Sequence, residues 1–456
     1  MAIELETRAR LLPERTRGGL REVVALASPV IVTNMSATLM HTVDSAMVGR
    51  LGATHLAAVG YALIWYWTAA CFFVGAASGV QTFVSQGHGA GENRTCGAWA
   101  WHGIFAVVPA ACVCIALFAA LAEPLFRLMG PSPEVQRLAA AYVRSRAFGI
   151  PGLVAAMAIA AFFRGIGDTR TPLYAMVLAN IVNFIFGYGL IFGSFGLPNW
   201  GIAGAGVATA IAEWVYFAVL VIALRRPRVD GEFDTSRPAF ETAALRRYAR
   251  TSAPIGGQWM LEMLSFAIFA NLVARMGDIE MASSQAMLVL QHMSFMQVMA
   301  VSVAATTLIG RYRGMGDFAA AERSHANALG IGVSIAVGVS ILFLTFPETM
   351  LRIFTEDAGV LSLGSRLLVI GALFQTCDAI GVVTSGSLRG AGDTRWPFVV
   401  QASLAWGLFL PSAFLFGQLL DGGVEGAWMG GVLYLGVLGL VLLRRFRRGE
   451  WRRIKI

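Results

Sequence analysis

Four acidic residues lie inside long apolar segments of the sequence, where a charged side chain is costly. They are Asp44, Glu213, Glu262 and Asp378. A charge at the centre of a bilayer costs at least about 2.5–3.5 kcal/mol on insertion scales, so each acid is a candidate for binding or moving ions. A carboxylate in low dielectric needs a proton, a cation or a hydrogen-bonding partner to offset its lost hydration.

Glu262 and Asp378 are the leading candidates for a shared site. Both are expected near the middle of apolar spans that run in opposite directions, at similar depth, so the two side chains can approach each other. Two carboxylates there cannot both stay ionised without a partner. A hard cation with oxygen ligands, or a proton, provides one. The alternative is a hydrogen-bonded pair with a structural role.

The composition indicates which elements must position these acids. Of the 456 residues, 57% are hydrophobic and 14% are charged, whereas about 25% of residues are charged in soluble proteins. Roughly 20 apolar residues cross a bilayer core as a helix. We therefore predict an all-α polytopic membrane protein with twelve transmembrane helices. The apolar segments run at 23–48, 56–84, 97–122, 136–163, 172–194, 201–224, 251–274, 281–309, 325–346, 362–388, 397–417 and 427–443.

The basic residues predict the orientation of these spans. With the N-terminus inside, 27 of the 35 Lys and Arg residues fall on the inner side. The positive-inside rule then places both termini in the cytoplasm. This asymmetry accounts for the net charge of +8, so nucleic-acid binding is not expected. The first twenty residues contain no apolar run, which argues against a cleavable signal peptide.

Glycine and proline residues that mark turns recur along the chain at one constant separation, called here the repeat offset. The clearest case, which defines it, is RGIGDTR at 164–170 against RGAGDTR at 389–395. Such a repeat predicts two six-helix lobes related by a pseudo-twofold axis along the membrane normal. The predicted parts are an arm at 1–22, an N-lobe at 23–224, a cytoplasmic linker at 225–250, a C-lobe at 251–443 and a basic tail at 444–456.

The repeat also separates functional acids from structural ones. At the repeat offset, Asp44, Glu262 and Asp378 correspond to Phe269, Ala37 and Leu153. Because one half builds the same helices without these acids, the scaffold does not require them. Glu213 stays open between a functional and a structural role.

Asp168 and Asp393, by contrast, recur in both halves and are interpreted as loop residues. In each GDTR-x-P turn, the acid and the threonine are expected to accept hydrogen bonds from free backbone amides before a proline opens the next helix.

Four stretches carry a family resemblance. They are VDSAMVGRLGATHLAAVG at 43–60, RGIGDTRTPLYAMVLANIVNF at 164–184, GIAGAGVATAIAEW at 201–214 and SLRGAGDTR at 387–395. They resemble the multidrug and toxic compound extrusion (MATE) family, most closely its NorM-like bacterial branch. The resemblance covers nearly the whole chain. It implies cation-coupled export of organic cations and aromatic drugs or dyes from a bacterial inner membrane.

The resemblance also implies roles for the acids. In the NorM-like branch the acids that match Glu262 and Asp378 bind the coupling cation, which makes this pair the predicted site for Na⁺ or H⁺. The acid that matches Asp44 takes part in cation or proton coupling in the N-lobe. Some relatives carry a second acid on the fifth span, where this chain has asparagines and apolar residues. That departure leaves the ligands of the N-lobe site open.

Neutral oxygens for the N-lobe site are available from neighbouring spans. Asn180, Asn183 and Thr209 can supply them, or these residues are hydrogen bonders that pack helices together.

Substrate-cleft candidates lie mainly on the eighth span, which is rich in methionine and glutamine. Gln285 matches a family position that lines the drug-binding cleft, and Met287 and Phe295 are placed beside it. Thioether side chains adapt to ligands of different shapes, although methionines on a span more often serve ordinary packing between helices. Glu356 and Asp357 match an acidic pair of some relatives. They either attract an organic cation or are solvated loop charges.

The resulting hypothesis is an antiporter that alternates between two open states. A cation or proton from outside neutralises Glu262 and Asp378 while a cationic drug leaves at the same face. No HExxH, GxSxG or Walker A motif is present, so neither an enzyme nor an ATP-driven pump is expected. A monomer in contact with lipid and without a cofactor is predicted. The alternative function is a lipid-linked saccharide flippase of the same superfamily.

Overall fold

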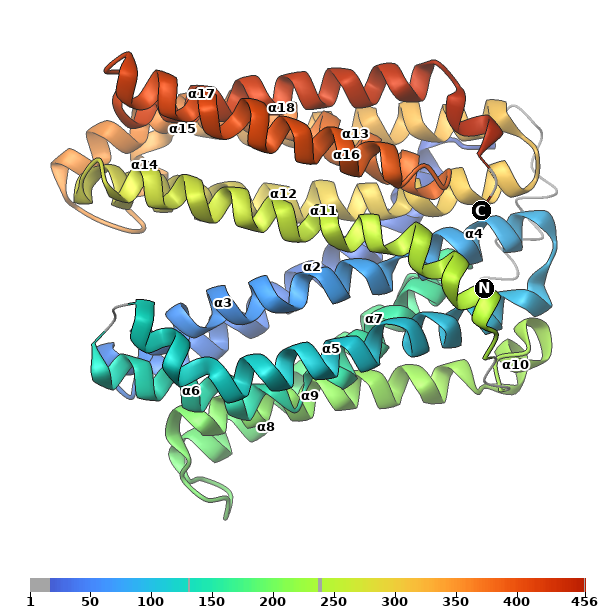
Figure 1. Cartoon of the computed structure of the whole chain (residues 1–456), viewed down its shortest axis with the longest axis horizontal. Coiled ribbons are helices and arrows are strands. Elements are labelled where there is room, and N and C mark those ends of the chain that lie inside the picture. The colour runs from blue at the N-terminus through green and yellow to red at the C-terminus, as the bar shows by residue number, and fades with distance from the viewer. Residues whose placement is uncertain (1–16, 130–131, 237–239, 455) are drawn as a thin grey trace. The chain divides into compact units, whose positions relative to one another are not determined.

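The computed structural model describes residues 17–129, 132–236, 240–454 and 456. Every regular element within these residues is helical (Figure 1). Most of the predicted arm 1–22, and Lys455 of the predicted tail, lie outside the described residues. The prediction of an all-α chain is confirmed.

The first half of the chain forms nine helices among the described residues. They are α2 (Leu20–Gly49), α3 (Ala53–Ser78), α4 (Val80–Ala90), α5 (Asn93–Met129), α6 (Pro133–Ala147), α7 (Ile150–Gly165), α8 (Arg170–Phe192), α9 (Gly201–Leu224) and the short α10 (Pro227–Phe233).

The second half forms eight further α-helices. Its α-helices are α11 (Thr242–Ala274), α12 (Asp278–Gly314), α13 (Phe318–Thr345), α14 (Pro347–Leu351), α15 (Ala358–Gly390), α16 (Arg395–Leu404), α17 (Leu410–Phe414) and α18 (Gly423–Arg447). Two π-helical turns, η2 (Ala405–Phe409) and η3 (Leu415–Leu419), adjoin α17, and a 3₁₀ turn, η4 (Glu450–Arg453), follows α18.

The described residues contain eleven helices long and apolar enough to cross a membrane, or twelve if one bent pair counts as a span. That pair is α6 and α7, which meet at an angle of 51°. The predicted fourth span, 136–163, is therefore a broken helix. Its counterpart in the second half, α15, is continuous.

A proline explains the irregular span that contains α16 and α17. Pro411 lies in the first turn of α17, directly after the π-helical turn Ala405–Phe409. Proline has no N–H to donate and its ring crowds the carbonyl four residues earlier. The widened turn relieves this crowding without ending the helix.

Matching glycine turns support the internal repeat. Gly91 and Gly316 have φ values of +82° and +76°, and Gly167 and Gly392 have φ values of +88° and +82°. The members of each pair are separated by the repeat offset. The left-handed region is readily open to glycine alone, so the same turn chemistry ends equivalent helices in both halves.

The packing divides the chain into two compact units. The N-unit is Val32–Met260, and the C-unit is Met1–Ile31 together with Leu261–Ile456, described here from residue 17. Both divisions fall inside a helix, α2 or α11, rather than in the linker 225–250. Each unit thus includes the opening part of a helix whose remainder belongs to the other unit, and these divisions differ from the boundaries expected from sequence.

Within each unit, helices from equivalent positions form the core. In the N-unit α9 packs against α6, α7 and α8, while α5 packs against α7. In the C-unit α15 contacts α12, α13 and α18, which run side by side in Figure 1. The C-unit core centres on aromatic rings, with Phe269 and Trp428 in edge-to-face contact at 4.7 Å.

Other helix faces remain apolar and exposed, as lipid-facing surfaces require. On α5, Val113, Leu117 and Leu121 recur every four residues and are 62%, 58% and 51% exposed. This spacing places them on one face of the helix. Such a stripe has no partner in water and is expected to contact acyl chains.

The linker that follows α9 is anchored to the N-unit. Phe233 of α10 is buried, and Trp101 Nε1 donates a hydrogen bond to the Thr235 carbonyl at 2.9 Å. The Ser236 amide donates to Asp230 Oδ1 at 2.6 Å. Hydrogen bonds from Ser236 hold the pKa of the Asp230 carboxyl below its ordinary value.

Candidate ion and substrate sites

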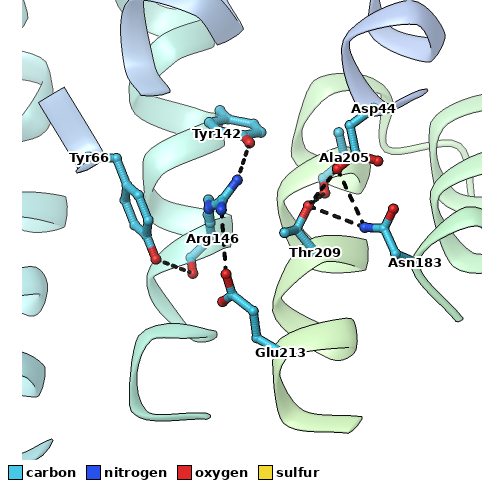
Figure 2. Close-up of polar contacts among 8 residues, drawn as sticks. All are labelled: Asp44, Tyr66, Tyr142, Arg146, Asn183, Ala205, Thr209 and Glu213. Carbon is cyan, nitrogen blue, oxygen red and sulfur yellow. Dashed lines mark hydrogen bonds and ion pairs between the residues drawn. The ribbon is translucent and has the colours of Figure 1, made fainter. Parts of the chain in front are cut away.

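Asp44 of α2 is the acceptor of a small hydrogen-bonded cluster in the N-unit (Figure 2). Its Oδ2 accepts hydrogen bonds from Thr209 Oγ1 at 3.2 Å and from Asn183 Nδ2 at 3.5 Å. Both partners are neutral, and Asp44 is only 8% exposed. The structure thus brings three predicted residues together from α2, α8 and α9. A carboxylate with this environment suits a proton or a cation.

Asn180 lies one turn before Asn183 on α8 and makes a different contact. Its Nδ2 donates to the Ser36 carbonyl at 2.8 Å and to Ser36 Oγ at 2.5 Å. Its Oδ1 is buried and has no hydrogen-bond partner among the described residues. The amide group therefore ties α8 to α2, and its oxygen stays available to a ligand.

Glu213 of α9 forms an ion pair that the sequence analysis missed. Its Oε1 lies 3.4 Å from Nη2 of Arg146, and the two side chains are 6% and 3% exposed. Arg146 Nη1 also donates to the Tyr142 hydroxyl at 2.8 Å (Figure 2). A basic residue inside a predicted span was the available signal.

In the C-unit, Glu262 of α11 and Asp378 of α15 share one region. Glu262 Oε2 accepts a hydrogen bond from Gln401 Nε2 at 3.2 Å, and the negative charge of Glu262 acts on Asp378. Both acids are partly buried. The Asp378 carboxylate has no hydrogen bond or ion pair with the other described residues. A proton or cation would relieve the repulsion between these two groups.

Three more residues belong to the surroundings of this pair. Gln401 is a direct partner of Glu262, Arg389 exerts its charge on Glu262, and Tyr434 is close enough to be affected by both acids. None of them was predicted. For Tyr434 the repeat held the signal, because it is the counterpart of Thr209 at the repeat offset.

A cation bound at this pair would need additional oxygen ligands. Among the residues that the structure describes, no group of three or more His, Cys, Asp and Glu side chains is placed to hold a metal ion. Hard monovalent and divalent cations accept amide, hydroxyl and carbonyl oxygens or water as ligands. The Gln401 amide and the Tyr434 hydroxyl are the nearby groups with such chemistry.

The predicted cleft residues of α12 do not share one environment. Gln285 is exposed, and Phe295 is partly buried with its ring 6.3 Å from that of His292. Met287 is 0% exposed and belongs to the C-unit core, packed against Gly371 of α15. We therefore assign Met287 a packing role in this conformation, since no ligand can reach it there.

Glu356 and Asp357, the two acids that precede α15, have different local roles. Both are exposed, but Asp357 is the N-cap of α15, and its Oδ1 accepts a hydrogen bond from the Val360 amide at 3.0 Å. A carboxylate at this place satisfies a free amide and complements the helix dipole. Glu356 has no such role and extends from the preceding loop.

The two GDTR turns differ although their sequences match. Asp168 Oδ1 accepts hydrogen bonds from the amides of Arg170 and Thr171, at 3.1 and 3.0 Å, as predicted. Asp393 instead binds Arg445 of α18, with its Oδ2 2.9 Å from Nε. The expectation of equal capping roles is wrong for Asp393, because the second half has a cation within reach. Thr169 and Thr394 occupy the N-cap positions of α8 and α16, but neither side chain makes a capping hydrogen bond.

A family model provides the deciding comparison. The MatE model matches residues 29–189 and again 254–415. The chain belongs to the MatE family. The two matches begin at Pro29 and Pro254, a separation equal to the repeat offset. The resemblance stated from sequence is thereby confirmed.

Relatives of the chain match over nearly its full length. A probable multidrug resistance protein NorM of Pseudomonas putida is 30% identical over 446 residues, which cover 95% of this chain and 94% of that protein. A multidrug resistance protein MdtK of Yersinia pseudotuberculosis is 28% identical, with 94% and 95% covered.

A solved structure confirms the fold. An outward-facing multidrug resistance MATE family transporter of the MOP superfamily superposes with a TM-score of 0.87 at 21% identity, covering 97% of this chain and 98% of that one. The MatE chain is thus a multi-pass membrane protein with the fold of these transporters. Because its family consists of transporters, the prediction that it is not an enzyme is also confirmed.

Proposed function

We propose that this MatE protein is a secondary active exporter of cationic and aromatic small molecules, driven by exchange for Na⁺ or H⁺. The names of its NorM and MdtK relatives support multidrug export. The single observation that carries the exchange is the pair of partly buried carboxylates in the C-unit, where Glu262 Oε2 accepts a hydrogen bond from the neutral Gln401 Nε2 at 3.2 Å. The Asp378 carboxylate has no hydrogen-bond partner or counter-ion among the described residues.

The coupling follows from competition for negative charge. When both acids are ionised, a bound organic cation stabilises them. When Na⁺ or H⁺ neutralises them, that stabilisation is lost and the organic cation dissociates more readily. By linkage, the ion and the drug must weaken each other by the same factor. Exchange moves drug outward when the protein binds either the coupling ion or the drug, but not both, as it changes between its two open states. The two lobes, 23–224 and 251–443, would supply alternating access.

The location follows from the same proposal. We place the chain in a bacterial inner membrane as a monomer, with both termini in the cytoplasm and no cofactor other than the coupling ion.

The proposal also assigns residues to substrate binding. Cationic drugs are attracted by the acidic site, and Gln285, Phe295 and Glu356 are the residues proposed to contact them.

Dye export from proteoliposomes tests the proposal. The full chain is reconstituted, and ethidium efflux is measured with a Na⁺ gradient and with a pH gradient, imposed separately. We expect one gradient to drive export, and Glu262→Gln and Asp378→Asn to abolish most of it. Export without any gradient dependence would contradict the antiport mechanism. Flipping of a labelled lipid-linked saccharide without dye export would favour the alternative function.

Control variants separate coupling from general effects of charge. Glu348→Gln removes an acid of the C-unit whose side chain is 66% exposed and whose partner, Arg352, lies one turn away. Asp421→Asn removes another exposed acid, at φ +53°, a conformation that asparagine tolerates. Both should transport like the wild type at equal expression.

A further inference from the structure

The end of α18 carries a group of arginines that the proposed exchange does not use. Arg444, Arg445 and Arg447 lie in the last turn of the helix. Arg445 Nε lies 2.9 Å from Asp393 Oδ2, and its guanidinium carbon lies 5.0 Å from the centre of the Trp396 ring. Arg444 and Arg447 are exposed and make no hydrogen bond or ion pair with another described residue. The same turn thus contains one cation with an internal partner and two without.

The two unpaired arginines lie on one face of α18. Arg444 and Arg447 are three residues apart, so their side chains are neighbours on the helix surface. Between them in sequence, Arg445 points toward α16 and Phe446 points toward α13, where its ring lies 4.0 Å from that of His325. Because successive side chains turn by about 100° around a helix, Arg444 and Arg447 point away from both of these packed helices.

This face continues along the membrane-spanning part of α18 as an exposed apolar stripe. Met429, Leu433 and Leu440 are 42%, 41% and 68% exposed. From Met429 through Arg444 to Arg447 the spacings are four, seven, four and three residues, which keep these side chains on one side of a helix. Since the chain is a multi-pass membrane protein, the stripe is expected to contact acyl chains. The arginines then lie where acyl chains end and headgroups begin.

The internal repeat shows that the helix end does not need these two charges. At the repeat offset Arg444 and Arg447 correspond to Val219 and Ile222 of α9. Ile222 is 66% exposed, and α9 has no basic residue in its last turn. Cations favour a helix C-terminus through its dipole, but the equivalent helix forms without them. The charge asymmetry of a membrane protein requires basic residues on one side, not on one face of a span.

The segment after α18 holds the helix end in place. The chain turns at Gly449, where φ is +69°, and Trp451 is 0% exposed. The Trp451 ring stacks on that of Phe446 with 5.1 Å between centres, and Arg452 pairs with Glu322 of α13. The arginines of the last turn are therefore presented from a fixed backbone.

We propose that Arg444 and Arg447 bind the phosphate group of an anionic phospholipid whose acyl chains lie along the exposed stripe of α18. Guanidinium groups pair with phosphate oxygens through parallel N–H donors, and two such groups on one face can hold one headgroup. An anionic headgroup is favoured over a zwitterionic one because no described acid neutralises either arginine. The stripe distinguishes the lipid from soluble phosphate, which gains nothing from apolar contacts. This site does not depend on the proposed exchange.

Lipid binding to the full-length chain in detergent tests the proposal. Native mass spectrometry measures how much phosphatidylglycerol, or phosphatidylcholine with the same acyl chains, stays bound across a titration. We expect the wild type to bind phosphatidylglycerol more tightly. Arg444→Gln with Arg447→Gln should weaken phosphatidylglycerol binding about 25-fold, because each basic residue near anionic lipid contributes about fivefold in affinity. Phosphatidylcholine binding should change little.

Matched variants separate the site from the net charge of the chain. Arg225→Gln with Arg228→Gln removes the same charge from two exposed arginines that follow α9, and should leave phosphatidylglycerol binding unchanged. Arg444→Lys with Arg447→Lys retains the charge but not the paired donors of the guanidinium groups. It should weaken binding less than the two glutamine substitutions do.

The contrary results are equally clear. Equal losses in the α18 and α9 variants, no loss in either, or an equal loss of phosphatidylcholine binding would overturn the proposal. Inorganic phosphate that displaces the lipid at similar concentration would assign the arginines to a soluble anion and overturn the lipid site. If the double variant does not fold, Arg444→Gln and Arg447→Gln singly should each weaken binding about fivefold. The rise in Tm on adding phosphatidylglycerol gives an independent measure of the same affinities.

Discussion

Thr209 and Tyr434 occupy the same position in the two repeats, and each lies near acids of its own unit. Thr209 donates its hydroxyl to Asp44 Oδ2 at 3.2 Å. Tyr434 is 3% exposed and close enough to Glu262 and Asp378 to be affected by their charges. The repeat therefore places a hydroxyl group near the acids in both halves, although the acids come from different positions.

Removal of the Tyr434 hydroxyl should weaken ion binding in the C-unit. The ring of Tyr434 stacks on Phe409 with 5.3 Å between centres, a contact that Tyr434→Phe retains. A hydroxyl oxygen is a ligand that a hard cation accepts, and loss of about 1.4 kcal/mol of binding free energy corresponds to tenfold in affinity. We expect the concentration of coupling ion needed for half-maximal dye export to rise by about tenfold or more. An unchanged ion dependence would place the hydroxyl outside the site.

The Thr209 hydroxyl should have the same importance in the N-unit. Thr209→Val keeps the shape of the side chain but leaves Asp44 with Asn183 as its remaining donor. Cation binding to the chain that carries Glu262→Gln and Asp378→Asn should weaken about tenfold. Thr209→Ser retains the hydroxyl and is the control. Equal loss in both variants would indicate a packing effect of the methyl group instead.

The sequence was sufficient to predict the all-helical architecture and its internal repeat, because apolar length and glycine turns are local signals. The repeat offset reappears in the left-handed turns at Gly167 and Gly392. The cluster of Asp44, Asn183 and Thr209 was also predictable, since unrepeated polar residues in spans are few. What limited the prediction was information about which residues of different helices meet.

Arg146 and Met287 illustrate this limit. A basic residue inside a predicted span looks like a topology signal until its partner, Glu213, is seen at 3.4 Å on another helix. A methionine on a polar helix looks like a cleft residue until its neighbours bury it completely. Both roles depend on contacts between elements distant in sequence, which periodicity does not encode.

The two GDTR turns should respond differently to one substitution. Asparagine caps helices about as well as aspartate, so Asp168→Asn should leave stability nearly unchanged. Asp393→Asn removes the negative partner of Arg445, whose side chain is 17% exposed. Loss of this charged hydrogen bond should cost about 1–2 kcal/mol and lower Tm by about 1–2 °C. Thermal unfolding of the purified variants compares them, and equal Tm values would contradict the difference seen between the turns.

Gly149 should be intolerant of a side chain because of its contact with α9. A Cβ there would lie 2.0 Å from Glu213 Oε2 and 2.8 Å from the Ala210 Cα, so α9 or the break between α6 and α7 must shift. Overpacking of this kind costs about 1–3 kcal/mol. We expect Gly149→Ala to lower Tm and to reduce ion-driven export, because Glu213 cannot keep its place beside Arg146. Gly381→Ala on α15 is the control, since its Cβ would meet nothing within 4 Å and alanine favours the helix. A Gly149→Ala variant as stable and active as Gly381→Ala would show that the carboxylate does not need this position.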